Sequence, residues 1–322
     1  MKQILSRFHR TSGGRLRFIV QTAALAYILF IGVRFVYYIA QLKRFNFDVS
    51  KPYGVEGFLP ISALLGFKQL VMTGAYDKVH AAGLTIFLAI VAVSFLFKKS
   101  FCSHICPVGF VSEQVTKVGK RWRIPVYIPI WFIKYFLLAF FVYIVVTMPV
   151  QAVRSFIFSP YNVVSDYKML ALFMPPSLTT VIVITVLLLL TLLFRNFWCK
   201  NLCPYGALLG VISVFSPLKV KRDVNLCINC LKCSDICPAS LRVHKQRVIH
   251  DPDCIGCHDC INVCPVEGCL ATTALSYKRH FPLLIVGFYM LYVGISMLGG
   301  LWESVVTNRD YWMIMMRGVG HP

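Results

Sequence analysis

Two cysteine runs of the same spacing lie in the last third of the chain. Both read C-x2-C-x2-C-x3-C-P, and their cysteines are Cys227, Cys230, Cys233 and Cys237, then Cys254, Cys257, Cys260 and Cys264. In such a pair of runs the first three cysteines of each run hold one 4Fe–4S cluster, and the fourth ligates the other cluster. The spacing therefore predicts one cluster on Cys227, Cys230, Cys233 and Cys264, and a second on Cys254, Cys257, Cys260 and Cys237.

A disulfide framework and a zinc site are the alternatives for a segment so rich in cysteine. Zinc needs only four ligands, so a zinc site does not explain why each run ends in C-x3-C-P, with a fourth cysteine set apart from the first three. Most of the 13 cysteines fall in redox-type motifs, and reduced thiolates fit a cytoplasmic location better than a disulfide-stapled one. The pattern therefore indicates a domain that carries electrons one at a time.

The rest of the chain has the composition of a membrane protein. Its 322 residues are 57% hydrophobic and only 14% charged, and the mean hydropathy is +0.69. A formal net charge of +20 also occurs in nucleic-acid-binding proteins, but basic residues beside apolar segments are what sets membrane topology. We therefore expect a lipid membrane, and no nucleic acid, as a partner.

Five apolar segments approach the ~20 residues that cross a bilayer; they are 16–40, 79–97, 130–150, 178–198 and 281–301. Segment 54–75 contains Glu56 and Lys68 and makes a poor lipid-facing span, so we interpret it as interfacial or re-entrant. The most basic loops then share one side with the ferredoxin-like runs. The positive-inside rule predicts a multi-pass protein of the bacterial inner (plasma) membrane, with those runs in the cytoplasm and the C-terminal tail outside.

A second cysteine pattern occurs twice without gaps, as LFKKSFCSHICPVG (96–109) and LFRNFWCKNLCPYG (193–206). Each copy follows an apolar segment and carries C-x3-C-P, at 102–107 and at 199–204. The repetition predicts a duplicated helical hairpin. Cysteines four apart on a helix lie on the same side, so the two pairs can meet in one site made by Cys102, Cys106, Cys199 and Cys203.

Four interpretations of these paired cysteines are open. They are a third iron–sulfur cluster, a soft metal such as Cu(I) or zinc, a dithiol/disulfide couple, and buried structural thiols. Duplication of the whole pattern argues against inert packing. The spacing alone does not choose the cofactor.

The fold class that follows is an α-helical integral membrane protein of about five spans with a small α+β ferredoxin domain. We expect a basic cytoplasmic N-terminus at 1–15, a membrane domain at 16–217 that includes the internal repeat, a two-cluster domain at 218–276, and a fifth span with a short extracytoplasmic tail at 277–322.

The paired C-x3-C-P motifs and the double cluster-binding run together resemble the NapH-like membrane ferredoxins. The resemblance implies a quinol dehydrogenase component that moves electrons between the quinol pool and a respiratory partner, with a cytochrome or iron–sulfur subunit beside it. It implies an electron-transfer subunit more than a self-contained enzyme. The alternatives are copper reduction in oxidase assembly, as in the RdxA/CcoG/FixG group, and a redox-sensing regulator.

Quinol oxidation releases two protons as well as two electrons, so ionisable groups at membrane depth are candidate acceptors. The sequence offers Glu56 and His80 as the candidate quinol and proton site, with Lys68 and Asp77 nearby. Because these residues are predicted on the side opposite the cysteines, either quinone binds near the cytoplasmic C-x3-C-P motifs or a partner supplies a redox centre near the outer face.

Overall fold

The structure is a computed structural model, and it describes residues 12–119, 132–274 and 280–319. Most of the predicted basic N-terminal segment, the start of the third predicted span and the junction before the fifth lie outside the described residues. The chain divides into two compact units. The first comprises 1–26, 90–138 and 185–290, and the second comprises 27–89, 139–184 and 291–322. Each unit is described by itself.

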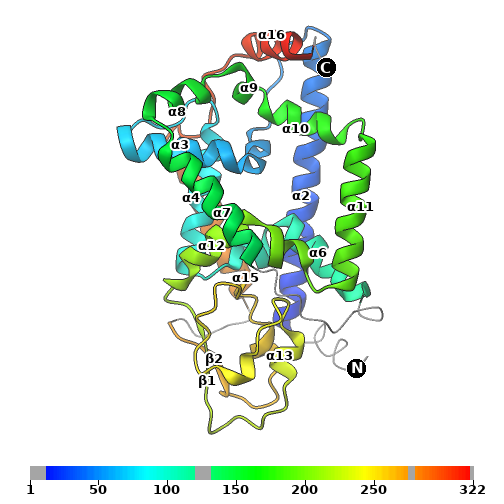
Figure 1. Cartoon of the computed structure of the whole chain (residues 1–322), viewed down its shortest axis with the longest axis vertical. Helices are drawn as coiled ribbons and strands as arrows, with labels where there is room; N and C mark the ends of the chain where they lie inside the picture. The colour runs from blue at the N-terminus through cyan, green and yellow to red at the C-terminus, as the bar shows by residue number, and fades with distance from the viewer. Residues whose placement is uncertain (1–11, 120–131, 275–279, 320–322) are drawn as a thin grey trace. The chain divides into compact units, whose positions relative to one another are not determined.

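Helices dominate the described residues (Figure 1). The five longest apolar helices contribute residues to both units, and they are α2 (Ser12–Lys43), α4 (Ala81–Leu96), α7 (Phe132–Thr147), α11 (Leu178–Leu193) and α15 (Phe281–Leu298). The first unit adds α5 (Ser100–His104), α6 (Pro107–Val118), η3 (Trp198–Leu202), α12 (Pro204–Val214), β1 (Val220–Arg222), α13 (Lys232–Ile236), η4 (Val243–Lys245), α14 (Asp259–Val263) and β2 (Leu270–Thr272). The second adds η1 (Tyr53–Phe58), α3 (Pro60–Thr73), α8 (Val150–Ile157), α9 (Pro160–Val163), α10 (Ser165–Phe173) and α16 (Asn308–Val319).

Two helices of the described residues are long and apolar enough to cross a membrane: Gly13–Lys43 within α2, and α15. A third is possible by the same criteria if α7 and α8 form one broken span, bent by 104°. Pro149 lies at that bend, where a proline interrupts helical hydrogen bonding. The structure therefore supports a membrane protein.

Helices occupy all five positions predicted for spans, but the prediction of five full spans is not established. Helices α4 and α11 have 16 residues each, which makes them about 24 Å long at 1.5 Å per residue. The hydrocarbon core is about 30 Å thick. Helix α11 nevertheless exposes much apolar surface, at Leu178, Val181, Ile182, Val183, Ile184, Val186, Leu188 and Leu189, as a lipid-facing helix does.

The second unit has its own apolar core, which includes Phe35, Tyr38, Leu42, Val153 and Met315. Helix α3 of segment 54–75 packs against α8 and has 14 residues, about 21 Å. The Lys68 ammonium of α3 donates hydrogen bonds to the carbonyl oxygens of Val145 (2.7 Å), Val146 (3.0 Å) and Met148 (2.5 Å). Since the last carbonyls of a helix lack partners within it, Lys68 satisfies the C-terminal end of α7.

The cysteine-rich segment of the first unit is a small α+β fold. Strands β1 and β2 pair antiparallel, with Val220 opposite Thr272. Short helices α13 and α14 pack on each other, and the core consists of Val220, Val243, Ile249, Leu270 and several of the cysteines. The strands that begin and end this segment are paired, so both its ends are held together.

Candidate iron–sulfur centres and a buried ionisable cluster

The two cysteine runs have matching backbone geometry. In each run a residue in the left-handed region, Leu231 (φ 63°) or His258 (φ 58°), precedes a five-residue helix. Each helix carries the third cysteine of its run, and the fourth cysteine ends it in extended conformation, at Cys237 or Cys264. Proline follows each time. This turn of the chain carries the fourth thiol away from the first three.

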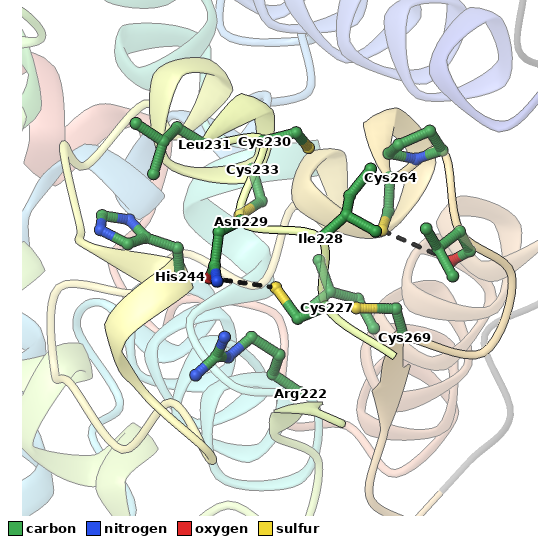
Figure 2. A pocket seen from close by; sticks show the side chains of 13 residues that line it. Arg222, Cys227, Ile228, Asn229, Cys230, Leu231, Cys233, His244, Cys264 and Cys269 are labelled. Carbon is green, nitrogen blue, oxygen red and sulfur yellow. Dashed lines mark hydrogen bonds between the residues drawn. The ribbon is translucent and has the colours of Figure 1, made fainter. Parts of the chain in front are cut away.

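One pocket brings together the four cysteines that the crossover pattern assigns to the first cluster. Its walls include Cys227, Cys230, Cys233 and Cys264 (Figure 2). Cys269, which the sequence pattern does not use, also lines this pocket. Its thiol interacts with those of Cys227 and Cys264, and it donates to the Asp223 carbonyl oxygen at 3.7 Å. The structure thus adds a fifth thiol to this pocket.

The other four cysteines also lie near one another. Cys254, Cys260 and Cys237 interact electrostatically, and Cys257 interacts with Cys260 and Cys237. Burial, together with the neighbouring Cys254, raises the pKa of the Cys237 thiol to about 11. A metal ion would offset this effect, because it stabilises the thiolate form of its cysteine ligands.

Both four-thiol sets fit a 4Fe–4S cluster by their chemistry, because four cysteine thiolates are its ligands. Among the described residues no three His, Cys, Asp or Glu side chains converge where a single metal ion would bind. In a 4Fe–4S cluster each thiolate binds a different iron, so the four sulfurs need not converge on one point. The fit therefore rests on the donor set and its grouping.

The two C-x3-C-P motifs match in local structure from their second cysteine onward, while Cys102 lies in the α-helix α5 and Cys199 in the π-helix η3. Cys106 and Cys203 are extended residues that precede α6 and α12, each with proline at the first helical position. The Cys203 Sγ atom accepts a hydrogen bond from the Gly206 N–H at 3.2 Å. Gly109 is required by space, since a Cβ there would lie 2.4 Å from the Cys102 carbonyl oxygen.

The four cysteines of these motifs come together in the first unit. The Cys102 thiol interacts electrostatically with those of Cys106, Cys203 and Cys199. Burial, together with neighbouring Cys106 and Cys203, raises the pKa of Cys199 to about 12. Four cysteines are a donor set that suits a soft metal centre or an iron–sulfur cluster.

The segments just before the two motifs bind the ferredoxin loops directly. The Ser100 hydroxyl lies 3.3 Å from the Gly256 carbonyl oxygen, and Gly256 has φ +59°. A Cβ on Gly256 would lie 2.6 Å from that hydroxyl oxygen, so only glycine allows this approach. Gly256 stands between Cys254 and Cys257.

The second repeat contacts the ferredoxin segment in a similar way, at Cys237 and Pro238, which end the first cysteine run. Arg195 donates to the Cys237 carbonyl oxygen at 2.7 Å, and the Asn196 amide donates to that of Pro238 at 3.0 Å. Both repeats therefore hold the same cysteine set, Cys254, Cys257, Cys260 and Cys237. By contrast, Cys230 and Ile228 of the other set are exposed.

Arg17 is a further link that the sequence did not indicate. Its guanidinium donates to Asp259 Oδ2 (2.7 Å), to Glu113 Oε2 (2.5 Å) and to the Ser103 carbonyl oxygen (3.0 Å). Asp259 adjoins Cys260, and Ser103 lies between Cys102 and Cys106. One buried side chain thus joins α2, α6 and both cysteine systems.

In the second unit the structure brings Glu56 and His80 into contact. His80 Nδ1 lies 3.3 Å from Glu56 Oε1, and His80 Nε2 lies 2.7 Å from the Asn162 carbonyl oxygen. Nε2 thus faces a carbonyl acceptor, while Nδ1 lies within ion-pair distance of Glu56 but lacks the geometry of a hydrogen bond. Both side chains are almost fully buried.

Lys51 and Asp166 complete this group, and neither was a candidate from the sequence. The Lys51 ammonium lies 2.9 Å from Glu56 Oε1 and 2.8 Å from Asp166 Oδ2. The Tyr311 hydroxyl donates to Asp166 Oδ1 at 2.6 Å. We call Lys51, Glu56, His80 and Asp166 the ionisable cluster.

In the ionisable cluster the positive groups stabilise the ionised form of the two carboxylates. Burial by itself raises the pKa of Glu56, but the Lys51 ammonium and the contact with His80 outweigh burial, so the pKa lies below its ordinary value. Asp166 is held ionised in the same way, because Lys51 and His80 outweigh the effect of burial on its pKa. Two cations and two carboxylates thus form a neutral buried set.

Comparison with known proteins identifies the class to which these sites belong. A 4Fe-4S binding domain model matches residues 79–125 and again 177–223, and a 4Fe-4S dicluster domain model matches 219–265. These matches, with the apolar helices, define a membrane-associated iron–sulfur electron carrier. No solved structure is significantly similar to the chain.

Similarity to whole proteins then gives the family. The chain is 36% identical to the putative electron transport protein YccM of Escherichia coli (strain K12), over 94% of this chain and 90% of that protein. It is 28% identical to the methylamine utilization ferredoxin-type protein MauN of Methylorubrum extorquens, over 61% of this chain and 66% of MauN. A match of 42% to the ferredoxin-type protein NapH of Haemophilus influenzae covers 15% of this chain and 17% of NapH. The chain belongs to the NapH-like superfamily of ferredoxin-type electron transport proteins.

Proposed function

We propose that this chain carries electrons between the quinol pool and a respiratory partner subunit, as a multi-pass protein of the bacterial inner membrane with its ferredoxin domain in the cytoplasm. The observation that carries the proposal is that the thiols of both C-x3-C-P motifs lie close enough to interact electrostatically, while the residues before the motifs hold the Cys254 and Cys237 loops. An electron relay needs redox sites that lie close to one another, and these contacts support such an arrangement.

The thiols of the two runs would hold two 4Fe–4S clusters, and Cys102, Cys106, Cys199 and Cys203 would hold a third. The match of a 4Fe-4S binding domain model to both repeats supports a cluster over copper at the third site. When bound, such clusters accept and release single electrons. Each quinol oxidised to quinone gives up two electrons, taken in two steps, and two protons, which the protein or water must accept.

The chain's own residues set the order of the centres. Ser100, Arg195 and Asn196 fix the Cys254 set beside the C-x3-C-P site. The Arg17 guanidinium donates to both Asp259 and the Ser103 carbonyl oxygen, so one side chain connects the two cysteine systems. The Cys227 set exposes Ile228 and Cys230, so it is the set that a partner can reach.

The ionisable cluster is the candidate site for the protons of the quinol. Because it is predicted on the side opposite the cysteines, a redox centre of the partner would carry the electrons from a quinol bound there to the clusters. Glu56 is held ionised and hydrogen-bonded by its cations, while His80 and Lys51 supply positive charge. Positive groups at fixed positions stabilise negative charge on an oxygen that loses its proton. Glu56 and His80 remain the candidate residues for this step.

Reduction by quinol tests the proposal in membranes that contain the native partners. We expect a reduced quinol analogue to generate the electron paramagnetic resonance (EPR) signals of the reduced clusters, and Glu56→Gln to slow their appearance at least tenfold. Dithionite should give the same signals in both proteins, which controls for cluster content. Clusters that dithionite reduces and quinol does not would rule out the quinol pool as the electron donor, and tightly bound copper at the C-x3-C-P site would favour metal handling instead.

A further inference from the structure

Asp77 is a buried carboxylate whose two oxygens have different environments. The residue is 0% exposed and lies just before α4. Its Oδ1 accepts the backbone N–H groups of Val79 (2.8 Å) and His80 (3.1 Å), as a capping carboxylate does at the start of a helix. One oxygen therefore has a structural role.

The other oxygen, Oδ2, has no hydrogen-bond partner among the described residues. It faces the buried side of α3, because a Cβ on Gly66 would lie 2.9 Å from it. Ser62 and Gln69 are buried on the same helix, four residues before and three after Gly66, so they share its face. Ser62 Oγ and Gln69 Oε1 also lack partners within the described part of the chain.

The charged groups around Asp77 are already balanced without it. Glu56 from η1 and His80 at the start of α4 act on it electrostatically, and the Tyr76 phenol is its chain neighbour. The face of α3 toward it presents Gly66, while Lys68 donates to the α7 carbonyls. In the ionisable cluster the cations Lys51 and His80 face Glu56 and Asp166, and Lys78 beside Asp77 is exposed to solvent. Within the described part of the chain no buried cation therefore pairs with Asp77.

An ionised carboxylate without a counter-ion is costly in a buried site, and the group takes up a proton instead. A protonated Oδ2 becomes a donor, which suits the unpartnered Gln69 Oε1 acceptor on α3, while the Ser62 hydroxyl can donate or accept. We infer that Asp77 is protonated at neutral pH and forms, with Ser62 and Gln69, a proton-binding site separate from the Glu56–His80 pair. Consistent with this, burial raises the pKa of Asp77, and the hydrogen bonds from His80 and Val79 only partly offset that effect.

A neutral acid beside a charged cluster can pass its proton on and take up another. In quinol oxidation Asp77 would first release its proton to water and then take up one of the two quinol protons, a use that rests on the proposed function. Proton binding by Asp77 in the resting protein does not rest on it, and it can be measured without quinol.

Infrared difference spectroscopy of the purified full chain tests the inference. At pH 7 we expect a carbonyl stretch of a protonated carboxylic acid, absent in Asp77→Asn, which keeps the Oδ1 acceptor. The exposed Asp48 gives a matched control, and Asp48→Asn should leave the band unchanged. In the unsubstituted protein, ¹³C labelling of aspartate carboxyls should shift the band to lower frequency, so the test does not depend on folding of the variant.

Two results would overturn the inference: no ¹³C-aspartate-sensitive acid band at pH 7, or a band that Asp77→Asn leaves intact. If the band is present and assigned to Asp77 but quinol does not reduce the clusters, the proton site stands and the quinol proposal fails. These measurements therefore distinguish failure of the proton-binding site at Asp77 from failure of the quinol proposal.

Discussion

Lys51→Met is expected to lower the free energy of unfolding by about 3–5 kcal/mol. The substitution removes the cation that lies within 3 Å of both Glu56 and Asp166 and leaves two buried carboxylates with only His80 between them. Breaking a buried ion pair from one side leaves an uncompensated charge, which is why the expected effect is large. Chemical unfolding of the detergent-solubilised protein, followed by the loss of helical circular dichroism, measures it.

Lys78→Met is the matched control, because Lys78 is an exposed lysine close to the same cluster in sequence. We expect its effect to stay within about 0.5 kcal/mol, as for surface substitutions. If the two lysine variants were equally stable, the ionisable cluster would not contribute to the fold as described.

Replacing Cys102 or Cys199 with serine is expected to abolish electron transfer from quinol to the ferredoxin clusters. Each substitution removes one thiolate of the four-thiol site, and a hydroxyl is a poor ligand for a soft metal centre. The eight ferredoxin cysteines are untouched, so both of their EPR signals should persist after dithionite reduction. The measurement is therefore the pair of spectra, one after quinol and one after dithionite.

Cys230→Ser is the reciprocal control. Cys230 is exposed, and its replacement should remove one ferredoxin signal while the C-x3-C-P site keeps its metal. Loss of both ferredoxin signals in Cys102→Ser would show instead that the paired cysteines act in folding.

Short-range patterns predicted which cysteines group together, and the clusters that they would bind stay a prediction. The crossover spacing groups Cys264 with the Cys227 run, and the structure places these cysteines around one pocket (Figure 2). The repeated C-x3-C-P motif likewise groups cysteines whose thiols interact in the structure. Such spacing works because the chain between ligands is short, so sequence distance limits spatial distance.

Long-range partners were not predictable in this way. Lys51, Asp166 and Tyr311 meet in one cluster although they come from three distant segments, and no local pattern marks them. Arg17 looked like part of an apolar segment, yet it binds Glu113 and Asp259. Charged residues at the ends of apolar helices were the available signal, but only the tertiary fold supplies their partners.

Hydropathy located the apolar helices but not their lengths. Helix α7 ends shortly before Pro149, which an apolar window from 130 to 150 passes over, although proline predicts a break there. Helices α4 and α11 occupy the predicted positions but are shorter than predicted, because hydropathy counts apolar residues in the adjoining turns as well.

The metal content of the purified protein tests most directly whether the chain holds three iron–sulfur centres. Iron and acid-labile sulfide should be measured per chain, with EPR after dithionite reduction and with copper and zinc in the same sample. Three 4Fe–4S clusters require about twelve iron and about twelve sulfide per chain. About eight of each, with one copper or zinc retained through Cys102 and Cys199, would contradict the account.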